Sequence, residues 1–386
     1  MNPTVQRFTI DGSDHLERHL TAVCGRVLEG VQGLLPAAKL HALVLAGGYG
    51  RGQGGVLRSK TGDEPYNDIE FYLFMPGMAW LNARRYDARL RALGEHLQSL
   101  ARVHVEFKID SLTALRRRTI SMFSYDLVAR QRIISGEPQV FCGCEHHLLP
   151  ATIPSLEATR LLLNRCTGLL LAQRILSENA TLTNDQADFV GRNLAKLQLA
   201  LGDAVLTALG QYHWNCLERH RRLCGLKASE LLPEFEKIRS AHEHGVEFKL
   251  HPTRRNESTQ NFRGESQELS ATGFNLWMWL ESRRLGRAFS TSRDYALSRI
   301  EKCRGPNKLC NYLLNLRTFG PRALLATDLG RYPRERLFNA LPLLLWYEQA
   351  AQEPEVMRRL QQQLLTKACD CSGWISAYKQ LWPNYG

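Results

Sequence analysis

The stretch Leu45–Gly55, "LAGGYGRGQGG", follows the apolar run "LHALV" and contains six glycines among eleven residues. Glycine at this density costs backbone entropy, so a chain keeps it where another group must come close to the backbone. The apolar run indicates a buried strand, and a glycine-rich turn after a strand is a common way to bind phosphate. The first question is therefore whether this turn belongs to a phosphate site.

Two familiar phosphate motifs do not fit the loop. Residues 50–55 formally match G-x-G-x-x-G, and Glu70 lies twenty residues after Gly50, as in a dinucleotide-binding fingerprint. That fingerprint requires a helix to begin at its third glycine, whereas the following "VLRSKTGDEPYND" has no helical pattern. A P-loop is excluded because no Gly-Lys-Ser/Thr follows. The loop must therefore be interpreted together with the strands that come after it.

Those strands carry acidic residues at matching positions. The apolar stretch "DIEFYLFM" (68–75) predicts a strand on which Asp68 and Glu70 point to the same face. Among apolar neighbours such a pair is costly unless it meets a cation, and its oxygen ligands suit Mg²⁺. The strictly alternating "RVHVEFKI" (102–109) predicts a further strand with Glu106 on its polar face. Glu106 is thus the candidate third carboxylate, and Asp110, which has the same parity, is the alternative.

At these residues the chain resembles the nucleotidyltransferase fold of the DNA polymerase beta superfamily. The signature is a Gly-Gly or Gly-Ser after a strand, an acidic-hydrophobic-acidic triplet, and a third carboxylate on a later strand. By position, Gly47 and Gly48 match the Gly-Gly, Asp68 and Glu70 match the metal-binding pair, and Glu106 matches the third acid. The resemblance covers about residues 40–110. The glycines and the acidic pair lie farther apart than in the family, so residues 54–65 are expected to form an inserted loop.

The resemblance implies transfer of a nucleoside monophosphate from an NTP to an acceptor hydroxyl, with release of pyrophosphate. It implies two Mg²⁺ ions, or Mn²⁺, held by Asp68, Glu70 and Glu106. The Gly47–Gly48 backbone would hold the triphosphate, with Arg51 either as its charge partner or as a solvated loop arginine. The alternative is a catalytically degenerate protein that binds nucleotide or RNA with the same fold. A solvated acidic pair beside a tight turn is the remaining interpretation.

The rest of the sequence predicts an α+β fold in two parts. Residues 1–140 contain the strands and two amphipathic helices (13–35 and 79–101), and form the predicted small mixed-sheet nucleotidyltransferase domain. Residues 141–386 are almost wholly helical in pattern and form the predicted larger all-α accessory domain, which would bind substrate.

Two features of the helical part bear on ligands. Lys196 shares one face of a long predicted helix with Arg192 and Asp203. This stripe predicts either a phosphate or base contact, with Lys196 as the nucleotide-binding candidate, or an exposed face with its own salt bridges. The polar stretch 251–267 predicts a surface loop anchored by Phe262.

Composition limits the partners. A hydrophobic fraction of 44% and a charged fraction of 23% are ordinary for a globular protein. No apolar run is long enough to span a membrane, and the N-terminus lacks the apolar core of a signal peptide, so we expect a cytoplasmic protein without a membrane partner. The net charge of +12 slightly favours an RNA 3′ end, such as that of a tRNA-like molecule, over a small-molecule acceptor. The sequence indicates neither the NTP used nor the oligomeric state.

Overall fold

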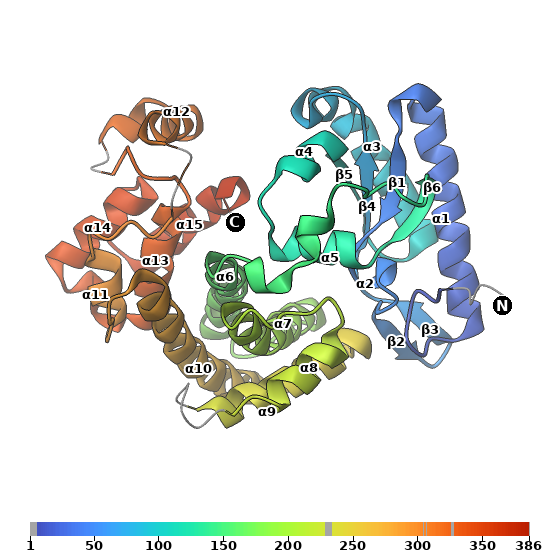
Figure 1. Cartoon of the computed structure of the whole chain (residues 1–386). Helices are drawn as coiled ribbons and strands as arrows, with labels where there is room; N and C mark the ends of the chain where they lie inside the picture. The colour runs from blue at the N-terminus through green and yellow to red at the C-terminus, as the bar shows by residue number, and fades with distance from the viewer. Residues whose placement is uncertain (1–5, 228–233, 304, 306, 326–327, 386) are drawn as a thin grey trace. The chain divides into compact units, whose positions relative to one another are not determined.

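The computed structural model describes residues 6–227, 234–303, 305, 307–325 and 328–385, and the chain divides into two compact units. Unit 1 consists of residues 1–154, 209–225 and 243–254; unit 2 consists of residues 155–208, 226–242 and 255–386. Unit 1 contains a small mixed sheet and unit 2 is helical, so the fold is α+β (Figure 1). Unit 1 thus includes two later segments of the chain in addition to its N-terminal part.

Four strands form the sheet of unit 1: β1 (Ala42–Leu45), β4 (Ile69–Phe74), β5 (Val105–Asp110) and β6 (Arg132–Gly136). Their order is β5-β4-β1-β6. Strand β1 runs antiparallel to both β4 and β6, whereas β4 and β5 are parallel. The strands predicted around the glycine loop and the acidic residues are confirmed as β1, β4 and β5, and β6 is an additional edge strand.

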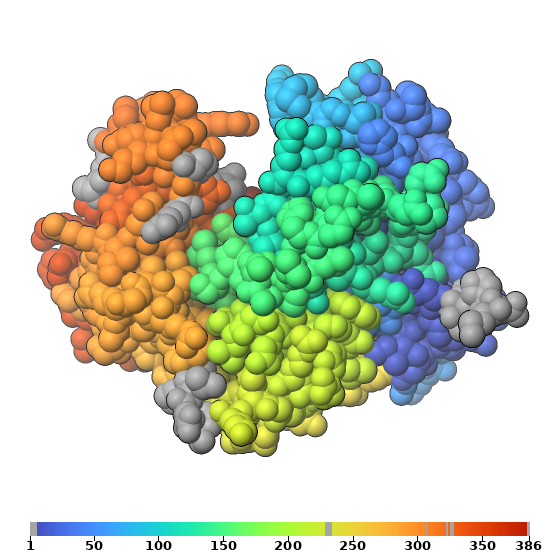
Figure 2. Space-filling model, in the orientation of Figure 1, coloured from blue at the N-terminus to red at the C-terminus, as the bar shows by residue number. Residues whose placement is uncertain are grey.

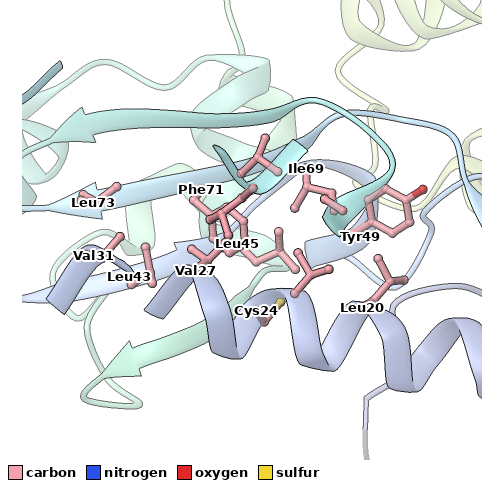
Figure 3. Close-up of a cluster of buried hydrophobic side chains, with 14 of the residues drawn as sticks. Leu20, Cys24, Val27, Val31, Leu43, Leu45, Tyr49, Ile69, Phe71 and Leu73 are labelled. Atoms are coloured by element: carbon pink, nitrogen blue, oxygen red, sulfur yellow. The ribbon is translucent and has the colours of Figure 1, made fainter. Parts of the chain in front are cut away.

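Helices cover both faces of this sheet. On one face, α1 (Asp14–Leu34) and α3 (Ala79–Ala101) bury the apolar side chains of β1 and β4. Figure 3 shows residues of α1 beside Leu43, Leu45 and Phe71 of these strands. Both helices were predicted, and the Ser13 side chain caps α1 by accepting a hydrogen bond from the Leu16 amide.

On the other face, α4 (Leu112–Arg117) and α5 (Met122–Ala129) supply Leu115 and Leu127, which pack against Tyr72 and Phe74 of β4. Residues 112–154 form one side of the surface of unit 1, coloured teal to green in Figure 2. Because side chains alternate along a strand, Glu70 belongs to the same face as Tyr72.

The segment between β1 and β4 contains the glycine loop. It comprises the short helical turn α2 (Gly47–Gly50) and an antiparallel hairpin of β2 (Val56–Ser59) and β3 (Gly62–Pro65). The insertion expected at residues 54–65 is therefore a two-stranded hairpin. Unit 1 also contains α8 (Cys216–Cys224) and the C-terminal part of α9 (Phe235–Leu250).

Unit 2 is built from long helices with wide apolar faces. The main ones are α6 (Leu156–Glu178), α7 (Asn184–Ala208) and α10 (Thr259–Leu285). The others are α11 (Ser292–Leu297), α12 (Lys308–Phe319), α13 (Glu335–Trp346), α14 (Pro354–Leu364) and α15 (Cys371–Tyr385). Short 3₁₀ turns lie at 320–325 and 348–351 in this unit, and at 37–39, 145–148 and 150–152 in unit 1. No helix in the described parts of the chain is long and apolar enough to cross a membrane.

The prediction of a surface loop at residues 251–267 was wrong for the second half of this stretch. Helix α10 begins at Thr259, and Ser258 caps it by accepting a hydrogen bond from the Asn261 amide at 3.1 Å. Phe262 is fully buried, and the guanidinium of Arg255 lies 5.0 Å from its ring centroid. The polar residues of this stretch therefore form the first turns of a long helix.

Candidate functional site

The glycine loop begins directly after β1, where Gly47 opens α2 with a φ of +64°. Glycine adopts this left-handed backbone readily, whereas other residues adopt it at a cost. A Cβ atom on Gly47 would lie 3.6 Å from the carboxyl carbon of Glu70. As the first residues of a helical turn, Gly47 and Gly48 have N–H groups without an intrahelical acceptor. The predicted phosphate-binding backbone and one predicted catalytic carboxylate are therefore neighbours.

Part of the glycine content of this loop serves packing rather than a ligand. A Cβ atom on Gly54 would lie 2.0 Å from the ring of Tyr49, which is almost fully buried. The Tyr49 hydroxyl donates to the Gly55 carbonyl and accepts from the Tyr66 amide, both at 2.9 Å. Burial, and to a smaller extent the nearby charge of Asp68, raises the pKa of this hydroxyl. The loop thus wraps around a buried tyrosine beside Asp68.

The parallel pairing of β4 and β5 brings two predicted site residues together. Glu70 and Glu106 are register partners, so their side chains lie on the same face of adjacent strands. Both are partly buried, while Asp68, just before β4, is exposed. Burial and the charges of Glu70, Glu106 and Asp110 raise the pKa of Tyr72, which places these carboxylates around one phenol. The expectation that Glu106 neighbours the acidic pair is confirmed for Glu70.

Positive charge already balances part of this acidic surface. The Lys108 ammonium lies 3.2 Å from a carboxylate oxygen of Glu106 and 5.7 Å from the ring centroid of Tyr72. Lys108 and Glu106 are both about two-fifths exposed, so this ion pair is solvated and contributes little to stability. Such a pair can open when a stronger cation binds the carboxylate.

The alternative third carboxylate, Asp110, is engaged elsewhere. Its two oxygens accept hydrogen bonds from the guanidinium of Arg118 at 2.8 and 3.0 Å, and one of them also accepts from the Ser111 amide. Asp110 is only 7% exposed and pairs in the sheet with Phe74, four positions beyond Glu70. Asp110 therefore serves a structural role, because it joins the end of β5 to Arg118. The strand register favours Glu106, and not Asp110, as the partner of Glu70.

The acidic residues of the candidate site supply some, but not all, of the ligands of a divalent cation. Within the described ranges, no three or more His, Cys, Asp or Glu side chains are grouped so that they could hold a metal ion. Glu70 and Glu106 supply a pair of adjacent carboxylates, and Mg²⁺ commonly binds through one or two carboxylates together with substrate phosphates and water. The pair is therefore suited to an ion whose coordination a nucleotide completes.

Arg51, predicted as a possible partner of the triphosphate, forms an ion pair with Asp126 of α5. The distance between Nη1 and Oδ2 is 3.0 Å, and both side chains are largely buried. The Nε of Arg51 and the Nε2 of Gln53 are buried without a hydrogen-bond acceptor in the described structure. Gln53 accepts from the Cys216 amide at 3.2 Å, which ties the loop to α8. The loop therefore carries buried donors that a bound anion could use.

Lys249 of α9 is a candidate residue that the sequence did not reveal. The backbone carbonyl of Lys249 lies 3.1 Å from where a Cβ atom on Gly55 would be. Burial, followed by the positive charges of Arg51 and Arg219, lowers the pKa of Lys249 to about 8. Arg219 is itself only 3% exposed and donates to the Tyr212 hydroxyl. In the described part of the chain Lys249 has no ion pair or hydrogen bond through its ammonium. Asp126 offsets part of this effect, so Arg51, Arg219, Lys249 and Asp126 together carry a net positive charge.

Lys196 lies on α7 in unit 2 and is exposed. Its neighbour on the predicted stripe, Arg192, pairs with Asp188 at 3.0 Å, and Asp203 is buried and in contact with His242 at 3.1 Å. The stripe is therefore not a uniform ligand-binding face, and the nucleotide-binding role of Lys196 stays a prediction.

Comparison of the chain with protein-family models, curated proteins and solved structures finds no match.

Proposed function

We propose that the chain is a nucleotidyltransferase of the DNA polymerase beta superfamily, with a catalytic α/β domain and a helical substrate-binding domain. It would transfer a nucleoside monophosphate from an NTP to an acceptor hydroxyl. One observation carries this proposal above the others. Glu70 and Glu106 are register partners on parallel strands, and the Glu70 carboxylate lies 3.6 Å from where a Cβ atom on Gly47 would be. A phosphate-binding turn beside paired carboxylates is what this chemistry requires.

In the proposed reaction the acceptor oxygen forms a bond to the α-phosphorus, the bond to the bridging oxygen breaks, and pyrophosphate leaves with that electron pair. The N–H groups of Gly47 and Gly48 would donate to the triphosphate, and Glu106 would take up the proton of the acceptor. Glu70 and Glu106 would hold Mg²⁺ or Mn²⁺ together with the triphosphate, and the exposed Asp68 stays a predicted third ligand. The ion would stabilise the charge that develops on the phosphate oxygens.

The charge of the site supports a triphosphate substrate. The partly buried ammonium of Lys249 lies near Arg51 and Arg219, and the nearby carboxylate of Asp126 is already paired with Arg51. A buried cation of this kind is unfavourable by itself and becomes favourable when an anion binds. We favour an RNA 3′ end over a small molecule as the acceptor, because the net charge of +12 favours a polyanion.

A second candidate function is a degenerate protein that binds a nucleotide or RNA without catalysis. Two observations favour it: Lys108 already pairs with Glu106, and the described residues contain no three-ligand metal cluster. Measurements of binding and of transfer separate these two functions.

The test measures both on the same proteins. Each NTP with Mg²⁺ or Mn²⁺ should raise the melting temperature, since a ligand that binds the native state stabilises it. Wild-type protein should transfer label from an α-labelled NTP to bulk RNA. Glu70→Gln should depress this transfer by two or more orders of magnitude, because metal stabilisation of the transition state is worth several kcal/mol.

The matched control is Glu95→Gln, which removes the charge of an exposed glutamate on α3 in the same unit. It should leave transfer unchanged. Nucleotide binding without transfer by the wild type would support the degenerate protein. Transfer that survives Glu70→Gln at the wild-type rate would mean that the wrong carboxylates have been assigned.

A further inference from the structure

Unit 2 contains a cavity of about 830 Å³ that the proposed transfer does not use. It lies between the C-terminal end of α6, one face of α10, and the residues at and after the end of α13 (helices labelled in Figure 1). Its volume is within the range of small-molecule sites, roughly 300–1,000 Å³.

The cavity exists because α10 presents small side chains along one stripe. Ser266, Ser270 and Ala271 line it, at helical spacing that puts them on one face. Trp346, the last residue of α13, also lines the cavity and is held against α10: its indole N–H donates to the carbonyl and the hydroxyl of Ser270, both at 3.1 Å. The ring centroids of Trp346 and Phe274 are 5.6 Å apart in an edge-to-face arrangement. Two aromatic side chains, one of them hydrogen-bonded in place, therefore line the cavity.

Polar groups in the lining have unused capacity. Ser266 is 2% exposed, and its hydroxyl has no hydrogen-bond partner among the described residues. Leaving such a group buried and unpaired is unfavourable, and a ligand can relieve it. Arg263 donates through Nε and Nη2 to the Leu176 carbonyl, at 3.2 and 2.7 Å, which holds the guanidinium beside the cavity. In the described structure this guanidinium has no carboxylate partner.

We propose that this cavity binds an unpaired nucleobase of single-stranded RNA. A base offers a flat ring to the surface of Trp346 and Phe274, and carbonyl and amino groups to Ser266 and Arg263. Aromatic side chains and arginine guanidinium groups are the usual contacts for splayed-out bases. An apolar ligand would leave the Ser266 hydroxyl unpaired, so the lining favours a ring with hydrogen-bonding edges. The inference concerns binding alone and does not depend on nucleotidyl transfer.

The experiment titrates a fluorescein-labelled RNA hexanucleotide with the full chain, without NTP or divalent cations, and follows fluorescence anisotropy. The variant Ala271→Phe places a large ring at an exposed position on the rim of the cavity, where it should fold normally. Stacking of a base on an aromatic side chain corresponds to about 5- to 150-fold in affinity, so affinity should fall at least fivefold. The matched control Ala92→Phe, at an exposed position of α3 in unit 1, should bind like wild type.

A second variant tests the unpaired hydroxyl. Ser266→Ala should weaken RNA binding about two- to tenfold, which corresponds to the loss of one hydrogen bond, and should not lower the melting temperature. A lower melting temperature with unchanged RNA affinity would show that the hydroxyl is structural and would overturn its role.

Two results would overturn the proposal as a whole. They are an Ala271→Phe variant that binds RNA as tightly as wild type, and an abasic sugar–phosphate hexamer that binds as tightly as the RNA. The first would place RNA elsewhere, and the second would mean that only the backbone is bound. Loss of nucleotidyl transfer in Glu70→Gln with RNA binding retained would leave this inference standing, so the two proposals can fail separately.

Discussion

Lys249→Met is the variant that most directly tests the positive charge beside the glycine loop. Methionine keeps the length and apolar stem of the side chain and removes its ammonium. Burial and the neighbouring arginines lower the pKa of Lys249 to about 8 from the ordinary lysine value of 10.5. A difference of about 2.5 pKa units corresponds to up to about 3 kcal/mol of unfavourable free energy in the charged, ligand-free protein at neutral pH. Removal of the charge should therefore raise the stability of unit 1.

The effect of Lys249 on the free energy of unfolding should depend on pH. The pKa of Lys249 is lower in the folded protein than in the unfolded chain, so between about pH 8 and pH 10 the unfolded chain binds more protons. The contribution of Lys249 to the free energy of unfolding should thus rise with pH across this window. The difference in melting temperature between Lys249→Met and wild type should be several degrees at pH 7, at roughly 2–4 °C per kcal/mol, and should shrink by pH 10.

Nucleotide should reverse the order of stability. A phosphate favours the charged form of Lys249, and a hydrogen bond to a charged group is worth about 1.5–3 kcal/mol. Lys249→Met should therefore weaken NTP binding by roughly 10- to 100-fold, and wild-type affinity should fall as the pH rises above 8. The assay is thermal unfolding with and without NTP and Mg²⁺, followed by isothermal titration calorimetry.

The matched control is Lys302→Met in unit 2. Lys302 is also buried with its pKa lowered to about 8, and its ammonium donates to the Ser298 carbonyl at 3.2 Å. Its replacement should leave the response to NTP unchanged. A Lys249→Met protein that is less stable than wild type and yet binds NTP equally well would refute a phosphate-binding role for Lys249.

Two further variants test the glycine turn and the core of unit 2. Gly47→Ala should lower the free energy of unfolding by about 1–2 kcal/mol, because of the positive φ, and should reduce transfer. The control Gly286→Ala, with a φ of +65° and open space around it, should lower the free energy of unfolding by the same amount in urea without reducing transfer. Equal activity of the two variants would show that Gly47 is not part of the site. Glu281→Gln should destabilise unit 2 by about 3–5 kcal/mol in urea unfolding, because the fully buried carboxylate pairs with Arg284 and accepts hydrogen bonds at 2.7 Å from Thr159 and Tyr295; a change below about 1 kcal/mol would contradict that view of the network.

Local periodicity predicted the elements that frame the candidate site. The strand before the glycine loop is apolar, the strand with Glu70 is apolar apart from that residue, and the strand with Glu106 alternates. The helix that begins after Ser13 combines a cap with a regular apolar stripe. The register of β4 and β5 could not be read from periodicity. Shared parity predicted that Glu106 would face the same side as Glu70, and only the sheet pairing shows that the two are direct partners.

The missed elements have weak local patterns. Strand β6, Arg-Ile-Ile-Ser-Gly, is a short and partly exposed edge strand whose sequence does not alternate between apolar and polar residues. Its pairing with β1 is also irregular between Leu43 and Val44. The first turns of α10 are polar on most sides, and their helical state depends on the Ser258 cap and on burial of Phe262. Such segments are determined by tertiary contacts rather than by local propensity.

The positive cluster beside the glycine loop could not have been found from sequence spacing, because its members are spread over about half of the chain. Arg51 comes from the loop, Asp126 from α5, Arg219 from α8 and Lys249 from α9. Each alone has the ordinary interpretation of a solvated charge. Together they bring three cations and one carboxylate into a partly buried region, which leaves a net positive charge that a bound anion would offset. Unit 1 therefore has two partly buried surfaces of opposite sign on its glycine segment, the Glu70–Glu106 pair at Gly47 and the cationic cluster at Arg51 and Gly55. A bound cation would offset the negative charge of the Glu70–Glu106 pair, and a bound anion would offset the positive charge of the cluster. A metal-bound nucleoside triphosphate carries both charges in one ligand. The two halves of the site should therefore bind cooperatively: Mg²⁺ should bind weakly without nucleotide, and nucleotide weakly without Mg²⁺.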